Sequence, residues 1–345
     1  FDPENESEID HISLSRWADI ILVVPTTANL MSKLSVGKAE DLATTVILAS
    51  DKDIVLVPAM NVRMWLHKAT QNNFKTLMSF GYKFIGPIKG EMACGEYGEG
   101  RMSSSRQIFS FLKNYFDKKN FLQEKKLKAL VTTGPTREYI DPIRFISNES
   151  SGKQGYEIAL ALARYGIKTT LVAGPSNINP SGDLKIKNVK TSDQMLNEVK
   201  KLLPVDIAVC AAAVSDFKPK KTNKNKIKKN ENKFKYIELE KNPDILDYLG
   251  KNNRLRPKIV VGFSAETENL VKNSFEKLKE KYCDLIIAND VSKKNSGINS
   301  DYNEVTIINK KGETEFIKKN KKNFIASVIA EKIIDKFLIN KKNIN

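Results

Sequence analysis

The chain has 345 residues, with 57 Lys or Arg against 41 Asp or Glu, and its formal net charge is +16. This length predicts two domains, and an apolar content of 41% excludes an intrinsically disordered chain. No apolar stretch approaches the roughly 18 residues of a membrane span, and no leader peptide is recognised, although the opening Phe1 predicts a fragment. Three separated cysteines exclude a disulfide scaffold and a cysteine-rich zinc site, and they predict a reducing cytoplasm.

The positive charge is confined to the second part of the chain. Residues 1–120 carry 14 basic and 14 acidic side chains, so the net charge of +16 lies entirely in residues 121–345. A basic domain indicates anionic partners such as phosphates, nucleotides or nucleic acid. The alternative is a lysine- and asparagine-rich composition in which most lysines are simply solvated.

Apolar runs alternate with amphipathic segments in the first domain. Strands are predicted over 18–24, 53–58 and 84–87, a loop over 25–29, and helices over 42–49 and 64–80. Strands that alternate with helices predict a parallel sheet covered on both faces. A charged segment over 117–126 predicts the linker, which places the two domains at residues 1–126 and 127–345.

The same alternation begins again in the second domain. The pattern predicts strands over 127–132, 167–173, 205–214, 258–263 and 284–289, helices that begin at Ser150 or Ser151, at Thr191 and at Asn323, and a hairpin over 305–317. Thr191 and Gln194 have the spacing of a capping box. Residues 218–235 contain nine lysines and one acidic residue, which predicts a mobile loop. A loop of this length within a compact domain more often has a function than not.

Three motifs of the second domain suit chemistry, and each has a structural alternative. Residues 150–155 open a helix and can bind phosphate, but small residues at such a turn also permit tight packing. The residue types at 242–245 suit the start of a helix with Asn242 as its N-cap. The same helix N-terminus could instead face a nucleotide. Lys277 and Lys281 share one helix face, which is either solvated or binds a triphosphate.

Two side chains of the first domain are also placed for chemistry. Asn61 follows a strand that ends at Pro58, and ligands of open parallel sheets bind at the carboxyl ends of strands. Cys94 lies in a glycine-rich loop, whereas Cys210 lies in an apolar run and is expected to fill the core. His11 has no distinguishing context of its own and is interpreted as a structural or surface residue.

Taken together, the sequence motifs between His11 and the final helix resemble those of the bacterial bifunctional coenzyme A biosynthesis family (CoaBC, also called Dfp). Phosphopantothenoylcysteine decarboxylase is resembled by the motifs that begin at His11, Pro25, Pro58 and Ala93. Those that begin at Thr133, Arg144, Ala211, Lys226 and Lys241 resemble phosphopantothenate–cysteine ligase. The family's decarboxylase domain normally begins roughly 60 residues earlier, with a strand and a glycine-containing turn that help to hold FMN, so we expect the sequence to be a fragment.

The resemblance implies an α/β protein of two domains, a flavodoxin-like domain that binds FMN and a Rossmann-like ligase domain that binds CTP with Mg²⁺. The metal ligands cannot be assigned. The implied ligase joins cysteine to 4′-phosphopantothenate through an acyl-cytidylate, and the implied decarboxylase converts 4′-phosphopantothenoylcysteine to 4′-phosphopantetheine. A cytoplasmic homo-oligomer is also implied, with trimeric decarboxylase and dimeric ligase contacts and without a nucleic acid or membrane partner.

For the decarboxylase, the resemblance implies that oxidation by the flavin allows the substrate carboxylate to leave. Cys94 is implied to reprotonate the product, which suits a thiol with a pKa of about 8.5. His11 is implied to orient the substrate or to act as a base, and Asn61 to hold the substrate carboxylate without an opposing charge. Contacts to FMN are implied for Pro25, Thr26, Thr27 and Asn29.

For the ligase, the resemblance implies that Lys226 closes over CTP and stabilises charge at the α-phosphate. Arg144 and Asn148 are implied to handle the acyl-cytidylate and the attack by cysteine. Further contacts to CTP are implied for Ala212, Asp216, Asn242, Pro243, Asp244, Ile245, Phe263, Lys277 and Lys281.

Three other classes of protein account for parts of the sequence. A nucleic-acid-binding protein would explain the charge, but it predicts aromatic residues among the lysines, and only Phe217, Phe234 and Tyr236 lie near the ends of that segment. A catalytically inactive relative would not be expected to retain His11, Asn61 and Cys94 together. A nicotinamide dehydrogenase would carry Gly-x-Gly-x-x-Gly, which the sequence lacks.

Overall fold

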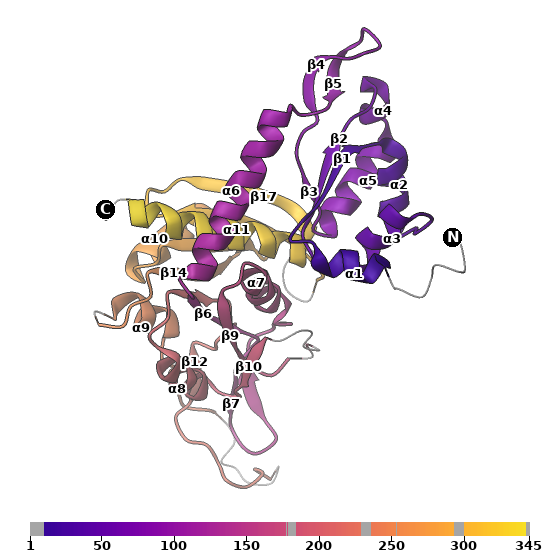
Figure 1. Cartoon of the computed structure of the whole chain (residues 1–345). Helices are drawn as coiled ribbons and strands as arrows, with labels where there is room; N and C mark the ends of the chain where they lie inside the picture. Colours follow the sequence, from indigo (N-terminus) through magenta and orange to yellow (C-terminus); the bar gives the residue numbers. More distant parts are fainter. Residues whose placement is uncertain are drawn as a thin grey trace. The chain divides into compact units, whose positions relative to one another are not determined.

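The computed structural model describes residues 10–176, 178, 184–228, 236–252, 254–292 and 300–342. The chain divides into two compact units, Phe1–Lys118 and Lys119–Asn345. Each unit has its own largely parallel sheet with helices packed against it (Figure 1). No helix within the described ranges is long and apolar enough to cross a bilayer.

The first unit contains a three-stranded parallel sheet in the order β1-β2-β3. Its elements are α1 (Asp10–Trp17), β1 (Ile21–Thr26), α2 (Ala28–Ser35), α3 (Leu42–Ala49), β2 (Ile54–Pro58), α4 (Val62–Leu66), α5 (Lys68–Ser79), β3 (Lys83–Phe84), β4 (Ile88–Glu91), β5 (Tyr97–Arg101) and α6 (Ser105–Glu124). β2 is buried along its whole length, which explains its unbroken apolar sequence. Leu56 and Val57 belong to separate apolar clusters, so both faces of this sheet are covered.

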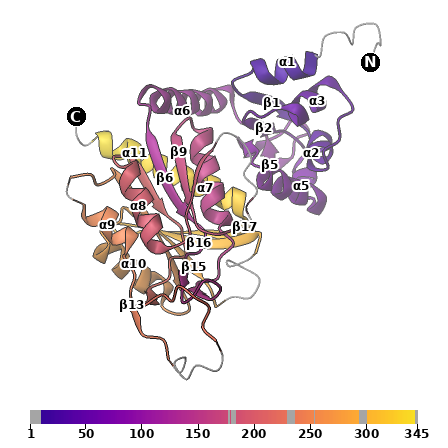
Figure 2. The same ribbon diagram turned by 90° about the horizontal axis from the view of Figure 1, so that it is seen from below.

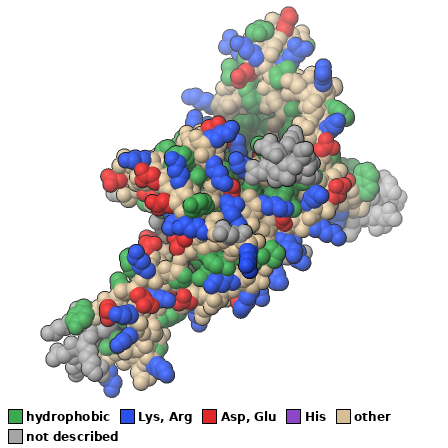
Figure 3. Space-filling view, turned by 90° about the vertical axis from the view of Figure 1, so that its left-hand side faces the viewer, with side chains coloured by type: hydrophobic (Ala, Val, Ile, Leu, Met, Phe, Trp, Pro, Cys, Tyr) green, Lys and Arg blue, Asp and Glu red, His purple; other side chains and the backbone are tan. Residues whose placement is uncertain are grey.

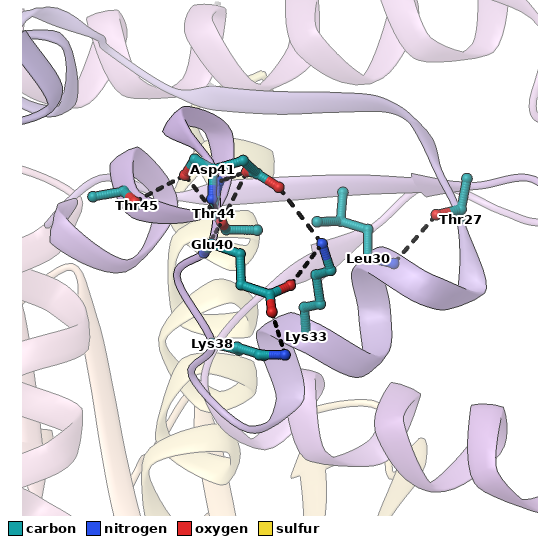
Figure 4. Close-up of polar contacts among 8 residues, drawn as sticks. All are labelled: Thr27, Leu30, Lys33, Lys38, Glu40, Asp41, Thr44 and Thr45. Atoms are coloured by element: carbon teal, nitrogen blue, oxygen red, sulfur yellow. Dashed lines mark hydrogen bonds and ion pairs between the residues drawn. The ribbon is translucent and has the colours of Figure 1, made fainter. Parts of the chain in front are cut away.

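Side-chain caps determine where the helices after β1 begin (Figure 4). Thr27 caps α2 by accepting a hydrogen bond from the backbone N–H three residues later, at 3.2 Å. Asp41 and Thr44 form a capping box at the start of α3. Lys33, near the end of α2, pairs with Glu40 at 3.0 Å and with Asp41 at 3.7 Å. These contacts fix the connection between the two helices, and the predicted helix over 42–49 is confirmed.

Two local predictions for the first unit are wrong in detail. The segment 25–29 is not a loop, because β1 continues to Thr26 and α2 begins at Ala28. The single helix predicted over 64–80 is divided at His67, whose side chain accepts a hydrogen bond from a backbone N–H at the start of α5. Such a side-chain cap begins a new helix in the middle of a helical pattern.

The segment 117–126, where the linker is predicted, is mostly helical, because α6 continues as far as Glu124. The charged residues in this stretch lie among apolar ones that the helix buries. Ile108 lies in a core of the first unit, and Leu122 is fully buried in a core of the second. The boundary between the compact units therefore lies within a helix and not in an irregular segment.

The second unit contains an eight-stranded sheet in the order β10-β9-β6-β11-β14-β15-β16-β17. Six strands are mutually parallel, namely β6 (Lys128–Thr133), β9 (Lys168–Ala173), β10 (Lys185–Asn188), β11 (Ile207–Cys210), β14 (Ile259–Glu266) and β15 (Leu285–Asp290). An antiparallel edge follows, formed by β16 (Tyr302–Asn309) and β17 (Thr314–Lys321), which confirms the predicted hairpin. This arrangement confirms the predicted α/β class.

Helices cover both faces of the large sheet (Figure 2). α7 (Lys153–Arg164) and α11 (Lys322–Lys342) contribute to one apolar core, and α8 (Ser192–Leu202), α9 (Ile245–Lys251) and α10 (Leu270–Glu280) contribute to the other. Two short antiparallel pairs lie outside the sheet, β7 (Arg137–Tyr139) with β8 (Phe145–Ser147), and β12 (Phe217–Pro219) with β13 (Leu239–Lys241).

The strand predicted over 205–214 is shorter than expected. β11 ends at Cys210, and Ala213 instead forms an isolated bridge with Pro135. In the lysine-rich segment 218–235, the first two residues belong to β12 and residues 220–228 are irregular. The prediction for residues 229–235 lies outside the described residues.

Two predicted helix starts and one predicted capping box also differ in detail. The N-cap of α7 is Gly152, with a φ of 71°, and neither Ser150 nor Ser151. The N-cap of α9 is Asp244 and not Asn242. Thr191 caps α8 as predicted, but the capping box is incomplete, because the Gln194 side-chain oxygen accepts from the backbone N–H of the residue before Thr191.

Candidate functional site

In the first unit, Asn61 and Cys94 come together at the carboxyl end of β2. The Asn61 side-chain oxygen accepts a hydrogen bond from the Arg63 backbone N–H at 2.8 Å and so caps α4. This bond leaves the amide nitrogen as a donor, and it donates to Glu96 Oε2 at 2.7 Å and to Cys94 Sγ at 3.6 Å. The structure therefore joins two of the predicted residues, and it adds Glu96, which was not predicted.

Glycines allow the β4–β5 hairpin, whose turn contains Cys94, to approach Asn61 closely. The Met60 backbone N–H donates to Gly100 O at 3.0 Å. A Cβ on Gly100 would lie 2.4 Å from Met60 O, and one on Gly98 would lie 2.9 Å from the Val62 side chain. Only glycine fits such approaches, which explains the glycine-rich sequence after the cysteine.

The other predicted residues of this unit are placed differently. No hydrogen bond or ion pair joins His11, on α1, to Asn61 or Cys94 in the described part of the chain. The Thr26 hydroxyl is buried and bridges two strands, since it donates to Val23 O at 2.9 Å and accepts from Val57 N at 3.2 Å. The Thr26 side chain is therefore committed to the fold.

Pro25, Thr27 and Asn29 are exposed around the start of α2 and remain accessible to a ligand. Thr27 accepts from a backbone N–H, and its hydroxyl proton is still available to a ligand. The first N–H groups of a helix have no acceptor within the helix. A neutral threonine and asparagine beside such groups suit an anionic or hydrogen-bonding ligand.

In the second unit, Asp141 ties the β7–β8 turn to the lysine-rich segment. Its fully buried carboxylate accepts hydrogen bonds from the backbone N–H groups of Ile143 at 2.9 Å, Arg144 at 2.8 Å and Ile227 at 3.3 Å. The hydrogen bond from Arg144 contributes most to lowering the pKa of Asp141 below its ordinary value of 3.8, although burial opposes it. Asp141 was not predicted, but an Asp followed by Pro is a turn signal that marks it.

Asp141 also brings Arg144 close to the residue beside Lys226. Arg144 Nε lies 3.5 Å from the Asp141 carboxylate, and its Nη2 donates to Ile227 O at 2.7 Å. The Thr222 hydroxyl, earlier in the same segment, donates to a backbone carbonyl of β7 at 3.0 Å. Lys226 itself is exposed. Arg144 and the neighbour of Lys226, which are far apart in sequence, thus lie in one hydrogen-bonded assembly.

We expect Asp141→Asn to lower thermal stability and to slow any reaction that uses Lys226, by up to about 100-fold if the lysine is misplaced by about 1 Å. Because the folded pKa is depressed, the stabilisation is complete above 3.8 and is lost as the pH falls through the folded value. The stability gap between the variant and the unmodified protein in thermal melts should therefore narrow below that pH.

Glu238→Gln is the matched control for Asp141→Asn. Glu238 binds Lys220 of the same segment at 2.6 Å, but the pair is exposed and should contribute little to stability. Equal effects of the two substitutions would show that Asp141 has no special positioning role.

The second group of predicted residues surrounds the entrance to α9. The Asn242 backbone N–H donates to Asp216 O at 2.9 Å, and its side-chain amide donates to Ser215 O at 2.8 Å. Asp244 caps α9 and pairs with Lys281 at 3.1 Å. Burial lowers the pKa of Lys281, but its bonds to Asp244 and neighbouring carboxylate charges outweigh burial and raise that pKa overall.

Asn148 connects to the same region, because its amide donates to Val214 O at 3.0 Å. The Ala212 N–H donates to a β6 threonine hydroxyl at 3.4 Å, so Ala212 lies at the carboxyl ends of the central strands. Phe263 and Lys277 are half-buried, and so is Pro243. The Ile245 side chain lies in the core, and only its backbone can face a ligand. In the described chain no hydrogen bond or ion pair joins Lys226 to the Asp244–Lys281 pair.

The remaining cysteines are structural. Cys210 packs against a core, as predicted, and burial raises the pKa of its thiol. Burial also raises the pKa of Cys283 to about 12. Cys94, by contrast, is an exposed free thiol.

Within the described ranges no three His, Cys, Asp or Glu residues are close enough together to hold a metal ion. On the face shown in Figure 3, lysines and arginines are interleaved with acidic side chains and are not gathered into one patch.

The fold and these sites define a class of two-unit α/β enzymes in which a flavoprotein unit precedes a pantothenate-metabolism unit. Residues 2–117 match the family model "Flavoprotein", and residues 124–337 match "DNA/pantothenate metabolism flavoprotein C-terminal domain". The coenzyme A biosynthesis bifunctional protein CoaBC of Haemophilus influenzae is 39% identical over 97% of this chain and 83% of its own. The protein of the same name from Borreliella burgdorferi is 40% identical over 90% of this chain and 78% of its own.

A solved structure supports the same assignment. The C-terminal domain of a coenzyme A biosynthesis bifunctional protein CoaBC superposes with a TM-score of 0.52 and 34% identity, covering 63% of this chain and 98% of that one. The chain belongs to the CoaBC family of bifunctional coenzyme A biosynthesis enzymes, which have ligase and decarboxylase activities. The family resemblance inferred from the sequence motifs is confirmed.

Proposed function

We propose that the second unit joins cysteine to 4′-phosphopantothenate and takes its energy from CTP with Mg²⁺. A substrate carboxylate oxygen would attack the α-phosphate of CTP, the bond to the β-phosphate would break, and pyrophosphate would leave. The amine of cysteine would then attack the acyl carbon, a C–N bond would form, and CMP and a proton would leave.

The observation that carries this proposal is the assembly of Asp141, Arg144 and Ile227. It places one arginine and the segment that holds Lys226 beside each other on a buried carboxylate. Two cations so placed can stabilise the charge that grows on the α-phosphate during the attack. The fixed backbone around Ile227 gives the exposed Lys226 a defined starting position for closing over the nucleotide.

The nucleotide itself is assigned to the region around α9. The Asn242 backbone N–H donates to Asp216 O, and Asp244, two residues later, pairs with Lys281. Lys277 lies one turn before Lys281 in the sequence and adds a second cation for a triphosphate.

Ala212 leaves room at the end of β11 for close passage of the ligand. Asn148 offers an amide oxygen to the acyl-cytidylate while its nitrogen is held by Val214. Mg²⁺ would be held chiefly by the phosphates, which fits the absence of a three-ligand cluster among the described residues.

For the first unit, we propose decarboxylation of 4′-phosphopantothenoylcysteine with Cys94 as proton donor and Asn61 as the carboxylate-binding residue. Asn61 Nδ2 already donates to a carboxylate, that of Glu96 at 2.7 Å, so its geometry suits the substrate's carboxylate. Cys94 Sγ is 3.6 Å from the same nitrogen, and this short distance supports a thiol that reaches the carbon from which the carboxylate would leave. His11 is assigned to substrate orientation or proton transfer.

FMN would be held by Pro25, Thr27 and Asn29, together with the backbone of Thr26 and the first N–H groups of α2. The exposed polar groups there fit a flavin phosphate or ring edge, and the match to the flavoprotein model supports a flavin cofactor. When bound, the flavin supplies the oxidation and reduction that make the carboxylate a leaving group. We further propose a cytoplasmic homo-oligomer with trimeric decarboxylase and dimeric ligase contacts.

The test is pyrophosphate release by the chain with 4′-phosphopantothenate, cysteine and Mg²⁺, comparing CTP with ATP. Release with CTP alone is the expected result. Release with ATP alone would support the ligase assignment but contradict the proposal that CTP is the nucleotide. A folded protein that releases pyrophosphate with neither nucleotide would contradict the proposed ligase.

A further inference from the structure

Both N–H groups of the Asn61 side-chain amide are already engaged. The amide oxygen accepts from the Arg63 backbone N–H at 2.8 Å, which fixes the orientation of the amide. The nitrogen Nδ2 donates to Glu96 Oε2 at 2.7 Å and to Cys94 Sγ at 3.6 Å. An amide nitrogen carries two hydrogens, so it has two bonds to give. A ligand that binds to this nitrogen must therefore replace one of its two present partners.

The two partners of the Asn61 nitrogen differ in strength. The distance of 2.7 Å to Glu96 is at the short end of the range for N–H···O hydrogen bonds, and a carboxylate acceptor makes such a bond stronger than a neutral one does. The sulfur of Cys94 is a weak acceptor, and it lies 3.6 Å away. Glu96 is therefore the partner that determines whether Asn61 is available to another carboxylate.

The side chain of Glu96 can leave Asn61 while the hairpin that carries it stays in place. The backbone of the turn is closed by two hydrogen bonds, from Met92 N–H to Glu96 O at 2.9 Å and from Gly95 N–H to Met92 O at 2.9 Å. Glu96 is exposed, so its side chain can rotate into water. Only side-chain torsions then change, and a move between staggered rotamers costs little.

We propose that the Glu96 carboxylate occupies the position of the substrate carboxylate on Asn61 when the site is empty, and that the substrate displaces it. This inference rests on the proposed decarboxylation in the first unit. The two carboxylates need the same donor, and their like charges repel each other, so Asn61 binds one of them at a time. Glu96 acts through Asn61 and is therefore a positioning residue and not a catalytic one.

The displacement of Glu96 makes the site distinguish substrate from product. The substrate must compete with Glu96 for Asn61, which weakens its apparent affinity by the fraction of molecules in which the amide is free. The product, 4′-phosphopantetheine, has lost its carboxylate and does not compete for the amide. Glu96 can therefore return to Asn61 as soon as the carboxylate has left as carbon dioxide, while the affinity for the product is unaffected.

Calorimetric titration of the full FMN-loaded chain tests the displacement with two matched ligands. The first is 4′-phosphopantothenoylserine, in which a hydroxyl replaces the thiol, and the second is 4′-phosphopantothenoylethanolamine, the same molecule without its carboxylate. Neither ligand has the thiol that the flavin would oxidise, so binding is measured without turnover. We expect Glu96→Ala to bind the serine compound about 10-fold more tightly than the unmodified protein does and to bind the ethanolamine compound equally well.

Two further variants define the cause of this gain. Glu96→Gln keeps an oxygen acceptor for Asn61 but removes the charge, so its gain should be smaller than that of Glu96→Ala. Glu99→Gln is the matched control, because it removes an exposed carboxylate from β5 of the same hairpin. It should bind both ligands as the unmodified protein does.

Steady-state kinetics give a second readout that a merely structural role would not produce. Glu96→Ala should lower KM for 4′-phosphopantothenoylcysteine by a similar factor and change kcat much less, because Glu96 competes with the bound substrate and does not contact the reacting atoms. The melting temperature should not change, since Glu96 is exposed.

Unchanged or weaker binding of the serine compound by Glu96→Ala would overturn the displacement, and so would an equal gain for both ligands, which would reflect the loss of negative charge alone. The titrations also separate this inference from the proposed function. If the unmodified chain forms no 4′-phosphopantetheine but Glu96→Ala gains affinity only for the serine compound, the displacement stands and the decarboxylase assignment fails. If product forms and Glu96→Ala binds both ligands as the unmodified protein does, only the displacement is wrong.

Discussion

Replacing Lys226 by glutamine is expected to abolish pyrophosphate release while the protein remains folded. Lys226 is exposed, so its loss removes no packing and should not change the melting temperature. Its neighbour Ile227 is held by Asp141 and Arg144, so the lysine has a defined position from which to reach the α-phosphate. Glutamine keeps the approximate length and polarity but removes the charge that stabilises the transition state. Loss of one such contact costs about 100- to 1,000-fold in rate.

Lys224→Gln is the matched control. Lys224 is exposed in the same irregular segment, and its replacement by glutamine removes the same charge. It should leave pyrophosphate release nearly unchanged, so that the contrast between the two variants depends on position and not on net charge. Normal release by Lys226→Gln would remove Lys226 from the mechanism. Equal losses in both variants would indicate a general electrostatic attraction of CTP by the segment.

The strands and most helices were predictable because local patterns determine them. β2 and the buried strands of the second unit are nearly continuous apolar runs, and parallel strands covered on both faces require such runs. The helical conformation of the predicted linker was not predictable in the same way. Charged residues at 117–126 suggest an irregular segment, but Leu122 among them is fully buried, and that burial depends on contacts with residues far along the chain.

The site was predictable only in part, and through resemblance more than through pattern. Cys94 and Asn61 were expected to act together, and the structure brings them into contact. Asp141 was missed because its role depends on a hydrogen bond to Ile227, and no local pattern reports so distant a contact.

The second large effect is expected at Cys94, where serine should prevent formation of 4′-phosphopantetheine in the FMN-loaded protein. A thiol has a pKa of about 8.5 and can donate a proton near neutral pH, whereas an alcohol is far too weak an acid. Serine is nearly isosteric and would keep the hydrogen bond from Asn61, now at 3.6 Å to sulfur, so the substrate should still bind. Substrate should therefore still change the flavin absorbance without product being released.

Cys283→Ala provides the control for Cys94→Ser, because it removes a thiol that is buried in the other unit. Product formation should persist in this variant, which would show that the loss at Cys94 reflects one thiol and not a general sensitivity to cysteine replacement. Undiminished 4′-phosphopantetheine from Cys94→Ser would eliminate the thiol as the proton donor. The donor would then be sought among the groups around Asn61, of which Glu96, at 2.7 Å from its amide nitrogen, is the nearest carboxylate described.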